Sequence, residues 1–176
     1  VDLLVDQVLA GAASRDAATE KVYLNDLIIR PCQSCGIDNR SRVCRIDDDM
    51  RLVRPLLLQS DLLVLGTPVY FDSVSAQMKL MIDRTNCLTP LVSRPDGTAG
   101  FLEPPAPGRR AVLVAVAGSR QQFRTTRTTV KGFLRWIGAE LVAEVLYSHD
   151  SVAAGTVSDD PDVLASAFAV GERAAA

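Results

Sequence analysis

The chain has 176 residues, of which 48% are hydrophobic and 23% are charged, as in a globular domain with a substantial core. Its net charge of −2 gives no electrostatic attraction for nucleic acid or for an anionic membrane surface. No apolar run has the roughly 18 residues of a membrane span, and residues 1–12 lack the basic start of a signal peptide. We therefore expect one domain over residues 1–176, in the cytoplasm, with neither nucleic acid nor membrane as a partner.

Helical and strand patterns alternate along the chain. Apolar residues at helical spacing predict helices over residues 1–12, 47–60, 74–82, 121–137 and 161–176. Apolar runs predict strands over residues 21–29, 62–65, 111–118 and 141–147. Pro55 should lie in the first turn of its helix or bend it, and residues 93–110 should form a long loop used for function or for an interface.

This alternation predicts the fold class, which is a doubly wound α/β fold with a parallel sheet and helices on both of its faces. The chain opens on a helix at residues 1–12, whereas such sheets are usually centred on a first strand. We therefore expect a first strand and the loop after it to precede Val1.

Residues 66–84 form the most informative stretch, because a buried strand leads through a polar loop into an amphipathic helix. Backbone donors in such a loop, next to a helix start, can hold an anion or a cofactor. Tyr70 and Phe71 add apolar or stacking surface. The stretch therefore predicts a cofactor-binding loop, although the same pattern is also typical of an ordinary strand-to-helix turn with core aromatics.

Cys32, Cys35 and Cys44 lie close together in the sequence, which in a cytoplasmic protein points to metal or redox chemistry. Three interpretations stay open: reduced thiols without a catalytic role, a redox-active or stress-induced disulfide, and a metal or iron–sulfur site completed by Asp38 or another ligand. Cys87 is expected to be a buried apolar residue.

The string TPVYFDSVSAQMKLMIDR at residues 67–84 resembles the NAD(P)H-dependent FMN reductase and iron–sulfur flavoprotein family. Three other features agree with this resemblance: the loop PCQSCG followed by Cys44, the acidic DDM at residues 48–50, and AVAGS at residues 115–119. The resemblance implies a flavodoxin-like, three-layer α/β/α fold with five parallel strands. It also implies FMN at the carboxyl ends of the strands, and a homodimer or homotetramer with flavin near the subunit interface.

The same resemblance implies that the flavin is held by two loops. The cofactor-binding residues that it indicates are Thr67, Pro68, Val69, Tyr70, Phe71, Ser73, Ala117, Gly118 and Ser119. Asp72 stands where relatives often have a small residue, so its carboxylate should either disfavour the anionic reduced flavin or point to solvent. No catalytic acid or base is expected, because the cofactor carries the chemistry.

Two departures from the family pattern affect this prediction. The Ser/Gly/Asn/Thr-rich phosphate loop of the family has no counterpart in the sequence. The cluster-binding members carry four cysteines, but Asp38 stands at the third position here, and carboxylate ligation of a [4Fe–4S] cluster is uncommon.

Three functions remain open from the sequence. The first is an oxidoreductase in which FMN takes hydride from NAD(P)H and passes electrons to a quinone, nitro compound, flavin or other small acceptor. The second is an electron-transfer protein with flavin and an iron–sulfur cluster, and the third is a non-catalytic relative.

The sequence leaves the roles of several charged residues open. Lys79 and the Asp83–Arg84 pair should order a subunit interface or the ribityl side of the pocket, or else form a solvated helix face. A basic stripe should bind NADPH phosphates or simply face solvent, and consists of Arg120, Arg124, Arg127, Lys131 and Arg135. His149 has no Cys or His partner nearby in the sequence and is not expected to be catalytic.

Overall fold

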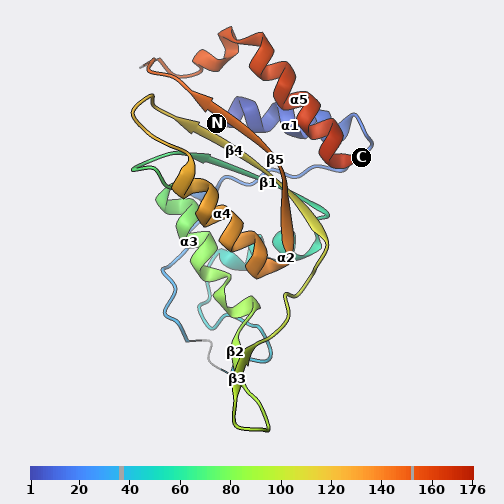
Figure 1. The fold of residues 1–176 in the computed structure, drawn as a ribbon, viewed down its shortest axis with the longest axis vertical. Helices are drawn as coiled ribbons and strands as arrows, with labels where there is room; N and C mark the ends of the chain where they lie inside the picture. The colour runs from blue at the N-terminus through green and yellow to red at the C-terminus, as the bar shows by residue number, and fades with distance from the viewer. Residues whose placement is uncertain (36–37, 152) are drawn as a thin grey trace.

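The computed structural model describes residues 1–35, 38–151 and 153–176, and its centre is a parallel sheet (Figure 1). The sheet has the order β1-β4-β5, formed by β1 (Leu62–Pro68), β4 (Arg109–Ala117) and β5 (Ala139–Ser148). The helices are α1 (Asp2–Ala13), α2 (Met50–Gln59), α3 (Ala76–Arg84), α4 (Arg124–Ile137) and α5 (Pro161–Ala175). The five predicted helices and three of the four predicted strands are thus confirmed. Pro55 lies inside α2 rather than in its first turn.

The helices form a layer on each face of the sheet (Figure 1). Along β4, Ala111, Leu113 and Ala115 pack into one core with α2, α3 and α4, whereas Val112 and Val114 pack into a second core with α1 and α5. This alternation follows from the strand repeat of two residues. It explains why β4 is apolar throughout, and it confirms the doubly wound, three-layer α/β/α fold.

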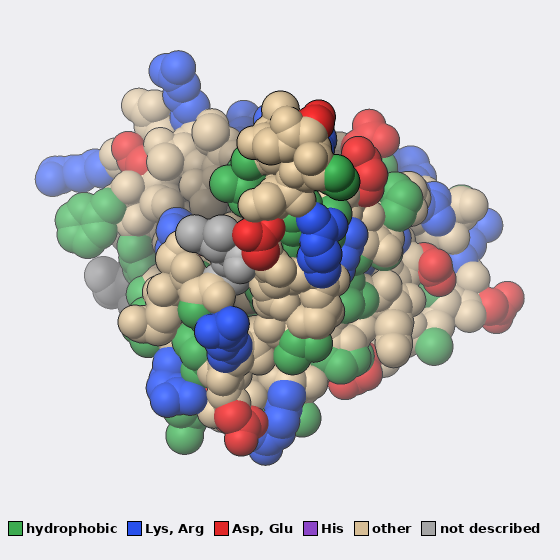
Figure 2. All heavy atoms as spheres, turned by 90° about the horizontal axis from the view of Figure 1, so that it is seen from below, with side chains coloured by type: hydrophobic (Ala, Val, Ile, Leu, Met, Phe, Trp, Pro, Cys, Tyr) green, Lys and Arg blue, Asp and Glu red, His purple; other side chains and the backbone are tan. Residues whose placement is uncertain are grey.

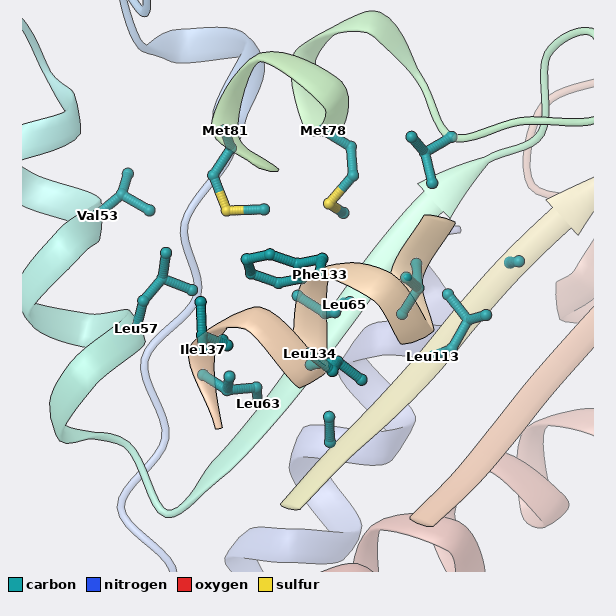
Figure 3. Close-up of a cluster of buried hydrophobic side chains, with 14 of the residues drawn as sticks. Val53, Leu57, Leu63, Leu65, Met78, Met81, Leu113, Phe133, Leu134 and Ile137 are labelled. Atoms are coloured by element: carbon teal, nitrogen blue, oxygen red, sulfur yellow. The ribbon is translucent and has the colours of Figure 1, made fainter. Parts of the chain in front are cut away.

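The larger core lies between the sheet and helices α2, α3 and α4 (Figure 3). Met78 and Met81 of α3 face Phe133 of α4, and all three side chains are at most 3% exposed. Leu63 and Leu65 of β1 close this core from the sheet side. The core therefore fixes α3, and with it the end of the loop that leads into α3, against the sheet.

The predicted strand over residues 21–29 is wrong. A 3-10 turn occupies Leu24–Asp26, and the chain on either side is extended without strand pairing. The turn residues Asn25 and Asp26 interrupt the apolar run. Backbone groups further along bond to the helix-leading aspartates instead, since Ile28 N–H donates to Asp49 Oδ2 at 2.9 Å. The sheet consequently has three parallel strands within the described residues, not the five that the resemblance implied.

The predicted loop over residues 93–110 is only partly irregular. β2 (Leu91–Ser93) and β3 (Ala99–Phe101) form an antiparallel hairpin that projects from the body of the molecule (Figure 1). The turn Pro95–Thr98 contains Gly97 at φ 81°, which accounts for the reversal. Phe101 contacts Trp136 of α4 edge-on at 5.0 Å between ring centroids, which holds the base of the hairpin against the domain.

Among the described residues, β1 has one strand partner, β4, which pairs along one of its edges. Its other edge lines a groove of about 1220 Å³, together with α1, the segment over residues 16–25, and α2. At the carboxyl end of β1 the groove reaches Pro68, Tyr70 and Ser75. The groove thus runs from the free edge of the sheet to the loop that the sequence marked as cofactor-binding.

The face of the molecule at the hairpin end carries no large patch of a single charge (Figure 2). Seen from the hairpin end, basic and acidic side chains are interspersed among apolar ones (Figure 2), in keeping with the net charge of −2. Within the described ranges, no helix combines the length and the hydropathy that a bilayer span requires.

Helices α1 and α5 approach each other closely through two glycines, which makes a prediction about packing. A methyl group on Gly171 would overlap the Val8 carbonyl oxygen, so Gly171→Ala is expected to lower the free energy of unfolding by about 2 kcal/mol. Gly132→Ala is the matched control, because nothing lies within 4 Å of its added methyl group. This control should be neutral or more stable by up to about 1 kcal/mol, and equal effects of both variants in urea denaturation would contradict the packing argument.

Candidate functional site

The two loops predicted to bind a cofactor lie side by side at the carboxyl edge of the sheet. Pro68 at the end of β1 is in register with Val116 near the end of β4. Just beyond, Val69 N–H donates to the Val116 carbonyl at 2.7 Å. The structure therefore brings residues 67–73 and 117–119 together, as expected for neighbouring parallel strands.

Residues 70–73 form a tight turn with an unusual backbone. Tyr70 and Ser73 exchange both backbone hydrogen bonds at 3.0 Å, and the central residues Phe71 and Asp72 have φ values of 51° and 60°. Such values suit Gly or Asn and are uncommon for a bulky residue. The Phe71 side chain is 98% exposed and that of Tyr70 is 58% exposed. A strained turn that presents two aromatic rings to solvent is typical of a binding loop.

The turn also offers backbone donors. Within the described part of the chain, the N–H groups of Phe71 and Asp72 have no acceptor, whereas those of Val69, Tyr70 and Ser73 are already bonded. Two adjacent free amides beside exposed aromatic rings suit a flat ligand with polar edges. The loop therefore offers fewer backbone donors than its sequence indicates, because only these two of its described amides are free to bind a ligand.

Two of the predicted binding residues act from inside the protein. Thr67 and Val69 are 0% and 2% exposed. The Thr67 hydroxyl accepts from Ser75 N–H at 3.0 Å and donates to the Pro68 carbonyl at 2.8 Å. Ser75 in turn caps α3 by accepting from Met78 N–H. These side chains shape the loop and fix the start of α3, and they are not exposed for contact with a ligand.

Asp72 clamps the two loops together. Its carboxylate accepts from Gln122 N–H at 2.7 Å, and its carbonyl oxygen accepts from Thr126 N–H at 3.0 Å and from the Thr126 hydroxyl. Thr126 lies in the first turn of α4 and is fully buried. The Asp72 carboxylate therefore does not point freely to solvent, because it joins the β1–α3 loop to the β4–α4 loop. Its effect on the anionic reduced flavin stays a prediction.

The second loop is held by a residue that follows β5. Ser119 N–H donates to Asp150 Oδ1 at 2.8 Å, and hydrogen bonding by Ser119 lowers the pKa of Asp150 below its usual range. His149 N–H donates to the Ala117 carbonyl at 3.1 Å, while its ring lies beside that of Tyr147. Gly118 has only Asp150 near the position of a side chain, which leaves its backbone open to close approach.

A buried ion pair lies where α3 meets the segment that carries three of the cysteines (residues 31–44, the cysteine loop). The Arg84 side chain is 0% exposed and contacts both carboxylate oxygens of Asp48, whose side chain is 4% exposed. Arg84 also donates to Cys44 Sγ at 3.2 Å and to the Arg30 carbonyl at 2.9 Å. Arg84 is thus not part of a solvated helix face, which corrects that expectation, whereas Lys79 and Asp83 form an exposed pair with each other at 2.7 Å. A role of these residues in ordering a subunit interface or the ribityl side of the pocket stays a prediction.

The residues of the cysteine loop do not fit a [4Fe–4S] cluster. All four cysteines are free, and the described residues contain no group of three or more Cys, His, Asp or Glu placed to hold a metal ion. Asp38 uses its carboxylate on Ser93, accepting from the N–H at 2.6 Å and from the hydroxyl at 3.1 Å. Gly36 and Ile37 of this loop lie outside the described residues. Cys87 is buried as predicted, and burial raises its pKa.

One residue of the basic stripe on α4 forms an ion pair within the protein. Arg127 pairs with Glu144 of β5 at 2.5 Å, which removes one cation from the stripe. Its neighbours Arg124 and Lys131 stay on the exposed face of α4. Binding of NADPH phosphates by this stripe remains a prediction.

Sequence reasoning missed the residues that hold the loops from a distance. Asp150 lies 31 positions from Ser119, and Thr126 lies 54 positions from Asp72. No local pattern marks such pairs. The DDM and DR strings that carried part of the resemblance did contain Asp48 and Arg84, but nothing in their spacing showed that the two side chains meet.

The fold and this edge of the sheet define a class of protein with a flavodoxin-like architecture, in which parallel strands present two loops at their carboxyl ends. The family profile of NADPH-dependent FMN reductase matches residues 2–153, and the chain belongs to that family.

Curated relatives with sequence similarity are iron–sulfur flavoproteins. The protein from Methanocaldococcus jannaschii is 36% identical over 86 residues, which cover 49% of this chain and 45% of the relative. The protein from Methanosarcina thermophila is 29% identical over 82 residues, covering 47% of this chain and 43% of the relative. The matched part therefore spans a little less than half the length of these relatives.

Solved structures confirm the fold at low sequence identity. RosB, solved with a bound riboflavin-phosphate derivative, superposes with a TM-score of 0.70 at 15% identity, covering 99% of this chain and 71% of RosB. A flavone reductase gives a TM-score of 0.66 at 18% identity, covering 99% of this chain and 57% of that structure. Azoreductase AzrA gives 0.59 at 15% identity, covering 98% of this chain and 89% of that structure.

Proposed function

We propose that this chain is the FMN-binding part of an NAD(P)H-dependent oxidoreductase that passes electrons to a quinone, a nitro compound, a free flavin or another small acceptor. The observation that carries the proposal is the strained turn at Phe71 and Asp72, with its two free amides and exposed aromatic rings beside the end of β4. Membership in the NADPH-dependent FMN reductase family supports the same conclusion.

Bound FMN would supply the redox chemistry, by accepting hydride from the nicotinamide and releasing electrons to the acceptor. The chain's own residues bind and orient it. The free amides of Phe71 and Asp72 would donate to the polar edge of the isoalloxazine, and Tyr70 and Phe71 would cover its apolar surface. Gly118 permits close approach of the backbone from the second loop. No side-chain acid or base is assigned.

The proposal is tested by measuring NAD(P)H oxidation. FMN-loaded protein is expected to oxidise NADH or NADPH in the presence of a quinone faster than the same concentration of free FMN, because the site orients donor and acceptor. Protein-free FMN is the control for the uncatalysed reaction. Flavin-loaded protein that is inert toward both nicotinamides would contradict the proposed reaction while leaving flavin binding intact.

A second candidate function is electron transfer without reduction of a substrate by this protein. The names of the curated relatives favour this candidate, because they describe iron–sulfur flavoproteins. Stoichiometric iron and sulfide, together with absent nicotinamide oxidation, would support it. Failure to bind FMN at all would instead support the third alternative, a non-catalytic relative.

We also propose that the protein acts in the cytoplasm as a homodimer or homotetramer with the flavin near the subunit interface. The 98% exposure of Phe71 supports a partner surface at this loop, since large apolar side chains are usually covered in the working assembly. Light scattering should give a mass of at least twice the 18.9 kDa of the chain. A monomer in the FMN-loaded state would contradict this proposal.

A further inference from the structure

The cysteine loop encloses a protein cation. Arg84 reaches it from α3 with a side chain that is 0% exposed, and both carboxylate oxygens of Asp48 hold its guanidinium in place. Asp48 is itself fixed, because it also accepts from Arg30 N–H at 2.9 Å and from Met50 N–H at 3.1 Å. A guanidinium held this firmly cannot leave without exposing a buried, unpaired carboxylate.

The sulfur of Cys44 faces this cation. Arg84 donates to Cys44 Sγ at 3.2 Å and to the Ile46 carbonyl at 3.3 Å, so the guanidinium occupies one side of the thiol. A sulfur that binds iron directs one lone pair at the metal and can still accept an N–H bond, but neighbouring ligands must converge on the same point. The described residues contain no group of three or more Cys, His, Asp or Glu placed in this way.

Asp38 is hydrogen-bonded to the β2–β3 hairpin. Its carboxylate bonds to Ser93 of the β2–β3 hairpin, and its own N–H donates to the Leu91 carbonyl at 3.0 Å. The two hydrogen bonds from Ser93 lower the pKa of Asp38, the backbone N–H having the larger effect. The carboxylate is thus charged, and both of its oxygens accept hydrogen bonds from the hairpin residue Ser93.

From these contacts we infer that the described part of the cysteine loop, residues 31–35 and 38–44, is held by contacts with the protein and does not carry a [4Fe–4S] cluster, with Cys44 bonded to Arg84. Arg84 of α3 holds both ends of the loop, at the Arg30 carbonyl and at Cys44, and Asp38 joins the middle of the loop to the hairpin. In lacking a cluster, this chain would differ from the iron–sulfur flavoproteins that it resembles. The inference does not depend on the proposed nicotinamide reaction.

Metal analysis of the purified full chain tests the inference. The protein is prepared without oxygen, incubated with ferrous iron, sulfide and a thiol reductant, and then desalted. Iron and acid-labile sulfide should stay far below one per chain. The iron–sulfur flavoprotein of Methanosarcina thermophila, treated in parallel, is the positive control. Retention of about four iron and four sulfide per chain would overturn the inference.

Thiol labelling gives an independent readout that does not rely on reconstitution. Anaerobic protein is treated with iodoacetamide, with or without an iron chelator, and the alkylated cysteines are identified by mass spectrometry. Cys32, Cys35 and Cys44 should react at rates that the chelator does not change, because free thiols need no release from metal. Protection of these three cysteines that disappears on chelation would show that they are metal ligands.

Discussion

Asp48→Asn is expected to lower the free energy of unfolding by about 3 kcal/mol, because it leaves the buried Arg84 guanidinium without its counter-charge. The Asp48 carboxylate accepts from Arg84 and from two backbone amides, so an asparagine cannot replace all of these bonds. Urea denaturation followed by circular dichroism measures the change. Asp47→Asn is the matched control, since its side chain is 94% exposed, and it should change stability by no more than about 0.5 kcal/mol.

The effect of Asp48→Asn should depend on pH. Burial alone would raise the pKa of Asp48, but hydrogen bonds from Arg84, Arg30 and Met50 outweigh burial and hold the pKa below its usual range. A carboxyl whose folded pKa is lowered contributes stability above the unfolded value of about 3.9, and loses it as the pH falls through the folded value. The gap between wild type and variant should be full at pH 7 and narrow below about pH 4. A gap that widens on acidification would contradict the ionic origin.

The central strands were predictable because their signal is local. Residues 62–65 and 111–118 are continuous apolar runs, and a strand buried on both faces needs no other information to be recognised. The helix that ends at Gly138 was predicted for the same reason, since the apolar face and the left-handed glycine at φ 82° are both encoded in adjacent residues.

Residues 21–29 show why the remaining prediction failed. Their composition fits a strand, but a strand forms only where a neighbour supplies hydrogen bonds, and this run does not pair with the free edge of β1, because the groove lies between them. The Asp49 side chain accepts from Ile28 N–H within the run, and Asp48 accepts from Arg30 N–H just after it. Composition cannot reveal this competition, because the two aspartates lie about twenty positions further along the chain.

The candidate site, like the fold, was only partly predictable from the sequence. The sequence indicated which residues lie in the two loops, because each loop directly follows a strand. It did not indicate that Thr67 and Val69 are buried, that Asp72 bonds across to α4, or that Arg84 faces Cys44. These features depend on side-chain direction and on contacts between distant segments, which the spacing of residue types does not encode.

Asp72→Ala is expected to weaken FMN binding about 30-fold, which corresponds to about 2 kcal/mol, on the proposal that the two loops hold the isoalloxazine. The variant removes the acceptor of Gln122 N–H and so frees the β1–α3 turn from the β4–α4 loop. Phe71 and Asp72 then lose part of the restraint that keeps both at positive φ. A site that must be ordered by its ligand binds more weakly than one already ordered. Titration by quenching of flavin fluorescence measures the affinity.

Asp72→Asn distinguishes the effect of the hydrogen bond from Gln122 from the effect of the carboxylate's negative charge. The asparagine side chain keeps an oxygen that can accept from Gln122 N–H, and the carbonyl bonds to Thr126 are unchanged in both variants. The asparagine variant should therefore bind FMN within about threefold of the wild type, because a neutral acceptor is weaker than a charged one. Circular dichroism checks that both variants are folded. Equal FMN affinity of the wild type and Asp72→Ala would mean that the loops stay ordered without the clamp, and that the strain at Phe71 is held by the turn itself.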